Sequence, residues 1–280
     1  MRRTSPSTRI IGETPDDKCK SDALCCTLKA SNSVISMTKT PQLSDNYMVT
    51  IAERLNSAYA RIAQAEKNHQ KPAKSVSLLA VSKTKPAQLI IDAYHAGHRK
   101  FGESYVQEAV EKIQQIPFND IEWHFIGPIQ SNKTKAIAEH FSWVQSIERP
   151  KIAERLNQQR PTNLPPLNVL IQVNISGEQS KSGCNLADVA ALSAHISQSK
   201  QLVLRGLMAI PAPSDDQAQL IASFSQLKTC FDTLKAQYPS IDTLSMGMSA
   251  DVEAAIAAGS TMVRIGTDIF GAREYPVEQH

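Results

Sequence analysis

The sequence predicts a (β/α)8 barrel of the TIM type, formed as a single domain by residues 44–280. From residue 44 onward, eight strand-like segments alternate with helical ones, which is the count that this barrel requires. Several of these segments are continuously apolar, as parallel strands covered on both faces should be. The main alternative, a doubly wound open sheet, calls for a glycine-rich turn after the first strand. Residues 82–88 (SKTKPAQ) occupy that place and contain no glycine.

Residues 1–43 differ from the rest of the chain. They are rich in serine and threonine, mixed in charge, and show no sustained helical or strand period, so we expect a disordered extension. The acidic residues Glu13, Asp16, Asp17 and Asp22 argue against a transit peptide. Met37 and Met48 are alternative start positions, which the sequence alone does not choose between.

Regular elements begin with an amphipathic helix over about 45–68, whose apolar residues recur at helical spacing. Short apolar runs rich in β-branched residues then predict the strands. The predicted strands are 76–82, 99–102, 121–126, 142–147, 167–175, 202–210, 242–247 and 261–265. The predicted helices between them are 86–96, 104–115, 132–140, 150–159, 186–199, 215–237 and 250–257.

Composition excludes several classes of protein. The formal charge of +3 is small for 280 residues, and no basic run is interleaved with aromatic residues, so we expect no nucleic-acid binding. No apolar stretch is long enough to span a membrane. The five cysteines are odd in number and include no C-x-x-C pair, which disfavours a disulfide framework and a zinc site and favours a reducing, cytoplasmic location.

Lys83 ends the first predicted strand in the run LLAVSKTKP. In a barrel of this type the active face is formed by the carboxyl ends of the strands. The side chain has three interpretations: it extends to solvent, it pairs with a carboxylate, or it acts as a nucleophile. Apolar strand ends and the neighbouring cations Lys85 and Arg264 favour a neutral amine, which can condense with an aldehyde.

The last two predicted strands end in turns suited to an anion. The segment SMGMSADVEAAI places Ser245, Gly247 and Ser249 before a helix, and RIGTDIFG places Gly266 and Thr267 after the eighth strand. Backbone N–H groups at such turns bind phosphate, and the loops after strands seven and eight commonly do so in these barrels. Ordinary capped turns are the alternative interpretation.

Arg264, in the eighth strand, is expected to point into the mouth of the barrel. It would either form a buried salt bridge, for instance with Glu103, or donate to a ring nitrogen and oppose its protonation. His124, at the end of the third strand, is interpreted as a buried core histidine or as an acid/base group.

These segments together resemble the pyridoxal phosphate homeostasis protein family, which consists of single-domain barrels similar to alanine racemase. The matching stretches run in family order over about residues 45–275. They are LLAVSKTKP, FGESYVQEA, WHFIGPIQSNK, NVLIQVNISGEQSKSG, LRGLMAIPAP and LSMGMSADVEAAIAAGSTMVRIGTDIFGAR. Ser104 stands where many family members have asparagine.

The resemblance implies a pyridoxal 5'-phosphate (PLP) cofactor, held as an aldimine on Lys83. It implies that Arg264 faces the pyridine nitrogen. It implies further that the phosphate is bound by the serines and by the eighth-strand turn: Ser245, Ser249, Gly266 and Thr267.

The function expected from this resemblance is intracellular PLP homeostasis and supply without robust catalysis, with no catalytic residue and no metal assigned. Two-domain racemases add a β-domain that contributes a tyrosine, for which the sequence up to His280 leaves no room, so a monomer and delivery to PLP-dependent apo-enzymes are expected. The alternatives are an amino-acid racemase, which needs a second acid/base such as His124 or Tyr105, and a Schiff-base aldolase, which leaves Arg264 unexplained.

Overall fold

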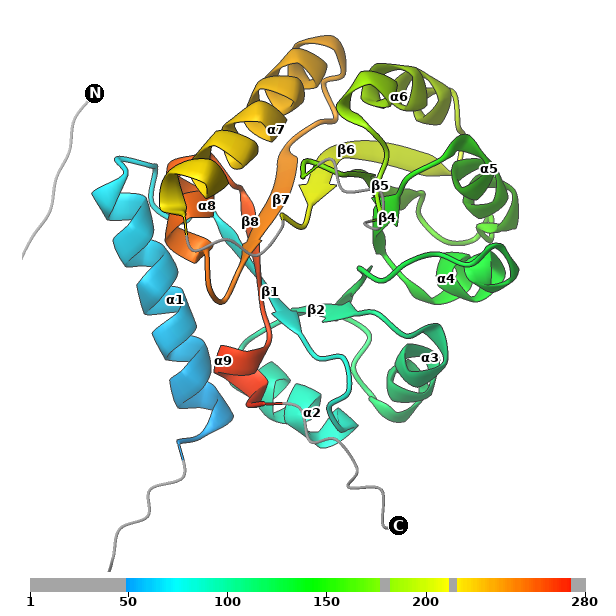
Figure 1. The fold of residues 1–280 in the computed structure, drawn as a ribbon. Coiled ribbons are helices and arrows are strands. Elements are labelled where there is room, and N and C mark those ends of the chain that lie inside the picture. Colours follow the sequence, from blue (N-terminus) through cyan, green and yellow to red (C-terminus); the bar gives the residue numbers. More distant parts are fainter. Residues whose placement is uncertain (1–48, 177–181, 212–215, 273–280) are drawn as a thin grey trace, which may run out of the picture. The chain divides into compact units, whose positions relative to one another are not determined.

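Eight parallel strands close into a barrel, in which each strand pairs with its neighbours in chain order and β8 pairs with β1 (Figure 1). The computed structural model describes residues 49–176, 182–211 and 216–272. The predicted (β/α)8 fold is therefore confirmed. The expected disordered extension, 1–43, lies outside the described residues.

The strands agree with the predicted segments to within two residues at most ends. Their bounds are β1 Ser77–Val81, β2 Lys100–Glu103, β3 Glu122–Phe125, β4 Trp143–Ile147, β5 Leu167–Val173, β6 Leu202–Ala209, β7 Thr243–Met248 and β8 Met262–Ile265.

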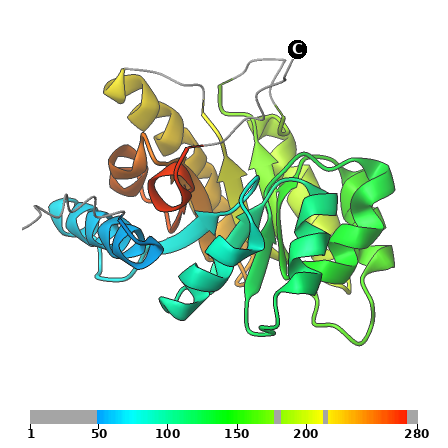
Figure 2. The same ribbon diagram turned by 90° about the horizontal axis from the view of Figure 1, so that it is seen from below.

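The helices lie outside the strands, as Figures 1 and 2 show. Two short 3-10 turns, η1 and η2, precede α4 and α6, and the four-residue helix α9 was not predicted. The bounds are α1 Ile51–Asn68, α2 Ala87–His95, α3 Val106–Gln115, η1 Ser131–Lys133, α4 Thr134–His140, α5 Pro150–Gln159, η2 Leu186–Asp188, α6 Val189–Ser197, α7 Gln217–Gln237, α8 Val252–Ala257 and α9 Thr267–Phe270.

Helix α1 completes the outer ring. Within the described residues, which end at Ala272, α9 is the one helix after β8. Helix α1 packs beside α9, α8 and α2, where a full eighth helix would otherwise lie (Figure 1). Its buried face includes Leu55, Ala58 and Ile62. The helix begins later than predicted because Thr50 caps it: the Thr50 hydroxyl accepts from the Glu53 N–H, and the Glu53 carboxylate accepts from the Thr50 N–H.

Two apolar layers support the strands. The large outer layer fills the space between strands and helices and includes Phe101, Phe125 and Phe224, all fully buried. A small cluster of Trp143, Leu170 and Met208 comes from β4, β5 and β6. Since side chains alternate between the faces of a strand, this second cluster lies inside the barrel.

Glu66, near the end of α1, fixes the entry into β1. Its side chain is buried, and its two oxygens accept from the Val76 N–H at 2.8 Å, the Lys74 N–H at 3.0 Å and the Ser75 hydroxyl at 3.3 Å. One carboxylate therefore satisfies two backbone donors that would otherwise be without an acceptor in this loop.

We expect Glu66→Ala to lower the free energy of unfolding by about 2 kcal/mol, because buried donors lose their acceptor. Urea unfolding followed by circular dichroism measures this change. The matched control is Glu111→Ala on the exposed face of α3, for which a change within about 0.5 kcal/mol is expected. Equal effects of the two substitutions would contradict this account of the loop.

Candidate functional site

The ends of β1, β7 and β8 lie side by side at one end of the barrel, because β8 pairs with both of the other strands. Lys83 follows β1, Ser249 follows β7, and Gly266 follows β8 directly. Gly266 packs so closely on β1 that a Cβ atom there would lie 3.1 Å from the carbonyl oxygen of Val81. The turns that carry Lys83, Ser249 and Thr267 therefore meet at the same mouth.

A buried ion-pair network fixes the Lys83 turn from the outside of the barrel. Ser82 donates its hydroxyl to Glu103 at 2.7 Å. The Lys112 ammonium, on α3, donates to the Ser82 carbonyl at 2.8 Å, to Glu103 at 2.9 Å and to Glu108 at 2.5 Å. Burial raises the pKa of Glu103, and the Lys112 charge opposes that shift. Lys83, the half-buried next residue, is thereby held on a fixed backbone.

Thr84 stores backbone strain in the same turn. Its φ of 64° is in the left-handed region, which is unfavourable for a β-branched residue and costs on the order of 1–3 kcal/mol. The Thr84 N–H donates to Glu108 at 2.6 Å, so the carboxylate that binds Lys112 also holds this conformation. A strained backbone conformation of this kind persists only where contacts with the surrounding structure hold it in place.

The other two turns present backbone donors. Among the described residues, the N–H groups of Ala250, Gly266 and Thr267 donate no hydrogen bond to a backbone carbonyl. The Gly247 backbone has a φ of 96°, and a Cβ there would lie 2.6 Å from that of Ala255, so the β7 turn needs glycine at this position. Several converging N–H donors suit a multiply charged anion such as a phosphate.

Arg264 lies below this mouth, inside the barrel, where its side chain is almost fully buried. The guanidinium donates to the carbonyl and the hydroxyl of Ser245 and to the carbonyl of Ala209, each at 2.8 Å. Burial lowers its pKa to about 10, so it stays protonated at neutral pH. The predicted alternative of a salt bridge with Glu103 is wrong, because Glu103 faces α3 and pairs with Lys112.

A chain of hydrogen bonds continues from Arg264 through the barrel interior. The Ser245 hydroxyl donates to Gln145 Oε1 at 2.7 Å, and Gln145 Nε2 donates to His124 Nδ1 at 2.9 Å. His124 Nε2 then donates to the carboxylate of Glu122 at 2.8 Å. This order of donors fixes the tautomer of His124, and burial lowers its pKa, so the imidazole is neutral. His124 is therefore a buried structural residue.

The predicted site residues thus separate into two groups. The turn residues Lys83, Ser249, Gly266 and Thr267 gather at the mouth. Arg264 and Ser245 lie deeper, and the Ser245 hydroxyl is already used by Arg264 and Gln145.

Sequence reasoning missed Gln145 and Lys112, which have buried side chains that organise the site. The available signals were an amide within the apolar run 142–147, and a lysine four residues after Glu108 on one face of α3.

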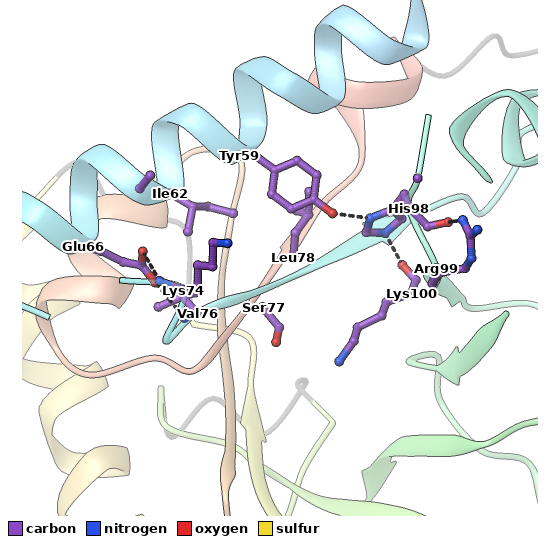
Figure 3. Close-up of a pocket in the computed structure, with 12 residues that line it drawn as sticks. Tyr59, Ile62, Glu66, Lys74, Val76, Ser77, Leu78, His98, Arg99 and Lys100 are labelled. Carbon is purple, nitrogen blue, oxygen red and sulfur yellow. Dashed lines mark hydrogen bonds between the residues drawn. The ribbon is translucent and has the colours of Figure 1, made fainter. Parts of the chain in front are cut away.

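A separate cavity of about 520 Å³ lies between α1 and the starting ends of β1 and β2, away from this mouth (Figure 3). His98 stands in its wall, with one ring nitrogen bonded to the Tyr59 hydroxyl and the other to the Lys100 carbonyl. Burial lowers the pKa of His98 to about 4. Both ring nitrogens of His98 are therefore bonded within the protein, so His98 does not offer a free group to a ligand in this cavity.

Two further classes of site receive no support from the described ranges. None of the helices in these ranges is long and apolar enough to span a membrane. The same ranges contain no group of three or more histidine, cysteine or acidic side chains placed to hold a metal ion.

A family model and a curated relative each match most of this chain. The family model described as "Alanine racemase, N-terminal domain" matches residues 54–274. The pyridoxal phosphate homeostasis protein of Vibrio alginolyticus is 56% identical over 232 residues, which are 81% of this chain and 100% of that protein.

Solved structures agree with these matches. The PipY protein of Synechococcus elongatus, solved with PLP bound, superposes with a TM-score of 0.69 and 38% identity, covering 79% of this chain and 100% of PipY. Alanine racemase of Clostridium difficile superposes with a TM-score of 0.62 at 11% identity, covering 79% of this chain and 61% of the racemase, which shows a shared fold only.

We expect Lys112→Met to lower the free energy of unfolding by about 3 kcal/mol, because Glu103 and the Ser82 carbonyl lose a buried cation. Chemical denaturation measures this loss. The control Lys135→Met removes a lysine from an exposed pair with Glu139 and should change stability by less than about 0.5 kcal/mol. A loss for Lys112→Met no larger than that of the control would contradict the role given to the network.

Proposed function

Because this chain belongs to the pyridoxal phosphate homeostasis protein family, we propose how its barrel mouth serves that family's role. The chain is a PLP-binding protein of PLP homeostasis. One observation supports assigning this function to particular residues. The Lys83 turn lies next to the turns after β7 and β8, which present backbone N–H donors. A single ligand with an aldehyde at one end and a phosphate at the other matches that arrangement.

Lys83 holds the cofactor covalently in this proposal. Its neutral amine attacks the aldehyde carbon, a C=N bond forms between Nζ and that carbon, and the aldehyde oxygen leaves as water. The fixed carbonyl of Ser82 and the strained backbone of Thr84 support this assignment, because they restrict the turn that carries the amine.

The phosphate binds at the other two turns. We assign it to the hydroxyls of Ser249 and Thr267 and to the N–H groups of Ser249, Ala250, Gly266 and Thr267. The N–H groups of Ala250, Gly266 and Thr267 donate to no backbone carbonyl among the described residues, which supports that assignment. We assign Ser245 a different role from the one expected from the resemblance. It orients Arg264, since its hydroxyl already bonds to that guanidinium and to Gln145.

Arg264 faces the pyridine nitrogen in this proposal and keeps it unprotonated. The guanidinium remains charged at neutral pH, and a second cation beside it is unfavourable. PLP supplies carbanion stabilisation when its ring nitrogen is protonated. Arg264 therefore limits that chemistry, which suits storage and supply of the cofactor to PLP-dependent apo-enzymes, with the chain acting as a cytoplasmic monomer.

The racemase alternative needs a second acid/base beside the cofactor. His124 does not fit this role, because it is fully buried and both ring nitrogens bond to protein groups. The aldolase alternative gives no role to Arg264. The domain assignment, 44–280 after an extension at 1–43, stays part of the proposal.

Lys83→Ala tests the covalent assignment. The purified wild-type protein with PLP should absorb in the visible range, and borohydride reduction should fix the cofactor to Lys83, as peptide mass spectrometry detects. We expect Lys83→Ala to lose both signals, because no amine remains at that position.

Lys85→Ala is the matched control, since the Lys85 ammonium donates to the Ala272 carbonyl at 2.5 Å. It should keep the visible absorbance and the fixed label. Label retained in Lys83→Ala at another lysine of the barrel mouth would contradict the assignment to Lys83, and a colourless wild-type protein would contradict the proposed function itself.

A further inference from the structure

Arg61 connects helix α1 to both of the donor-rich turns. Its guanidinium Nη1 donates to the carbonyl of Ser249 at 2.7 Å. Nε and Nη2 donate to the two oxygens of Glu253 at 2.6 Å each, and Nη1 also lies 3.3 Å from Asp268. One side chain thus bonds to the turn after β7, to the first turn of α8 and to the first turn of α9.

These contacts fix the distance between the two turns. Ser249 and Thr267 follow different strands, and the residue pairing between β7 and β8 ends at Met248 and Arg264, just before the two turns. Arg61 connects the two turns beyond the sheet. It donates to the carbonyl of Ser249 and to the carboxylate of Asp268, the residue after Thr267. The planar guanidinium suits this task, because its donors are rigidly arranged.

Arg61 also neutralises carboxylates next to an anion site. Glu253 and Asp268 stand in the first turns of α8 and α9 and would repel a phosphate. The hydrogen bonds from Arg61 lower the pKa of Glu253, so this carboxylate is charged and paired at neutral pH. Without Arg61, two unpaired negative charges would face the same region.

We propose that Arg61 is a positioning residue for the phosphate of the cofactor, so that helix α1 forms part of the binding site. This inference rests on the proposed function, which places the phosphate at the two turns. Arg61 acts through them: it sets their separation and cancels the charge of Glu253 and Asp268. The helix that replaces the eighth helix of the barrel therefore determines how well the mouth discriminates phosphorylated from unphosphorylated ligand.

The rival explanation is that Arg61 only attaches α1 to the barrel. That role would change stability and would weaken all ligands equally. The comparison of PLP with pyridoxal, which carries a hydroxyl in place of the phosphate, separates the two explanations, because both ligands react with Lys83 and only PLP uses the turns.

The experiment titrates PLP and pyridoxal separately into wild-type protein, Arg61→Gln and Arg61→Lys, and follows visible absorbance. For Arg61→Gln we expect the Kd for PLP to rise about tenfold, as when a group that orients direct ligands is lost. The Kd for pyridoxal should stay within about twofold of wild type. Arg61→Lys keeps the positive charge but loses the bidentate hydrogen bonds to Glu253. We therefore expect a smaller rise in the Kd for PLP, of about threefold.

The matched control is Lys67→Gln, which removes one positive charge from the last turn of the same helix, where Lys67 is exposed. It should bind both ligands as the wild type does. An unchanged Kd for PLP in Arg61→Gln, or an equal rise for both ligands, would overturn the inference while wild-type binding still supports the proposed function. If Arg61→Gln does not fold, an unchanged ratio of the two Kd values in Arg61→Lys overturns it.

Discussion

A buried positive charge is the constraint around which this barrel interior is organised. Arg264 has no carboxylate partner in the described ranges, and its cost of burial is offset by neutral acceptors, namely the carbonyls of Ser245 and Ala209 and the Ser245 hydroxyl. That hydroxyl is oriented in turn by Gln145 and His124, so a polar column replaces part of the apolar packing expected inside such a barrel. If the ligand binds as proposed, its ring acceptor would meet a guanidinium whose position is already fixed by these hydrogen bonds.

Closure of the barrel brings the start and the end of the described chain into one site. Lys83 belongs to the first βα turn and Thr267 to the last, and they become neighbours only because β8 pairs with β1. The helix ring closes differently from the strands, with α1 in the place of a full eighth helix. Because α1 occupies that place, its residue Arg61 reaches the turns after β7 and β8. The position of α1 in the helix ring thus contributes both to packing of the barrel and to the proposed site.

The sequence predicted most of the fold, since continuous apolar runs mark buried parallel strands and their ends locate Lys83, Ser249 and Gly266. Helix α9 was missed because four residues are too few for a helical period. The family resemblance implied that Ser245 binds the phosphate, whereas its hydroxyl bonds to Gln145 and Arg264. The direction of this side chain depends on the strand pleat and on the irregular register between Ser245 and Met248, which composition does not reveal. Arg61 acts through partners up to 207 positions away, as in its contact with Asp268, so no local pattern indicates its role. Gln145 and Lys112 do leave local signals, but those signals do not identify Ser245 and the Ser82 carbonyl as their partners.

The arrangement favours holding a cofactor over turning over a substrate. Catalysis on an α-carbon needs two proton-transfer groups and a ring that accepts electrons. In the proposed arrangement Arg264 opposes protonation of the ring nitrogen. The histidine of the interior column, His124, donates to Glu122 and accepts from Gln145, so its ring has no free position. The groups that the proposal places at the mouth are an amine and phosphate donors, which suit retention of PLP. Under the proposal, strength of retention would depend mainly on the phosphate turns, and through them on α1, so a family member with this architecture would adjust release of the cofactor at this helix.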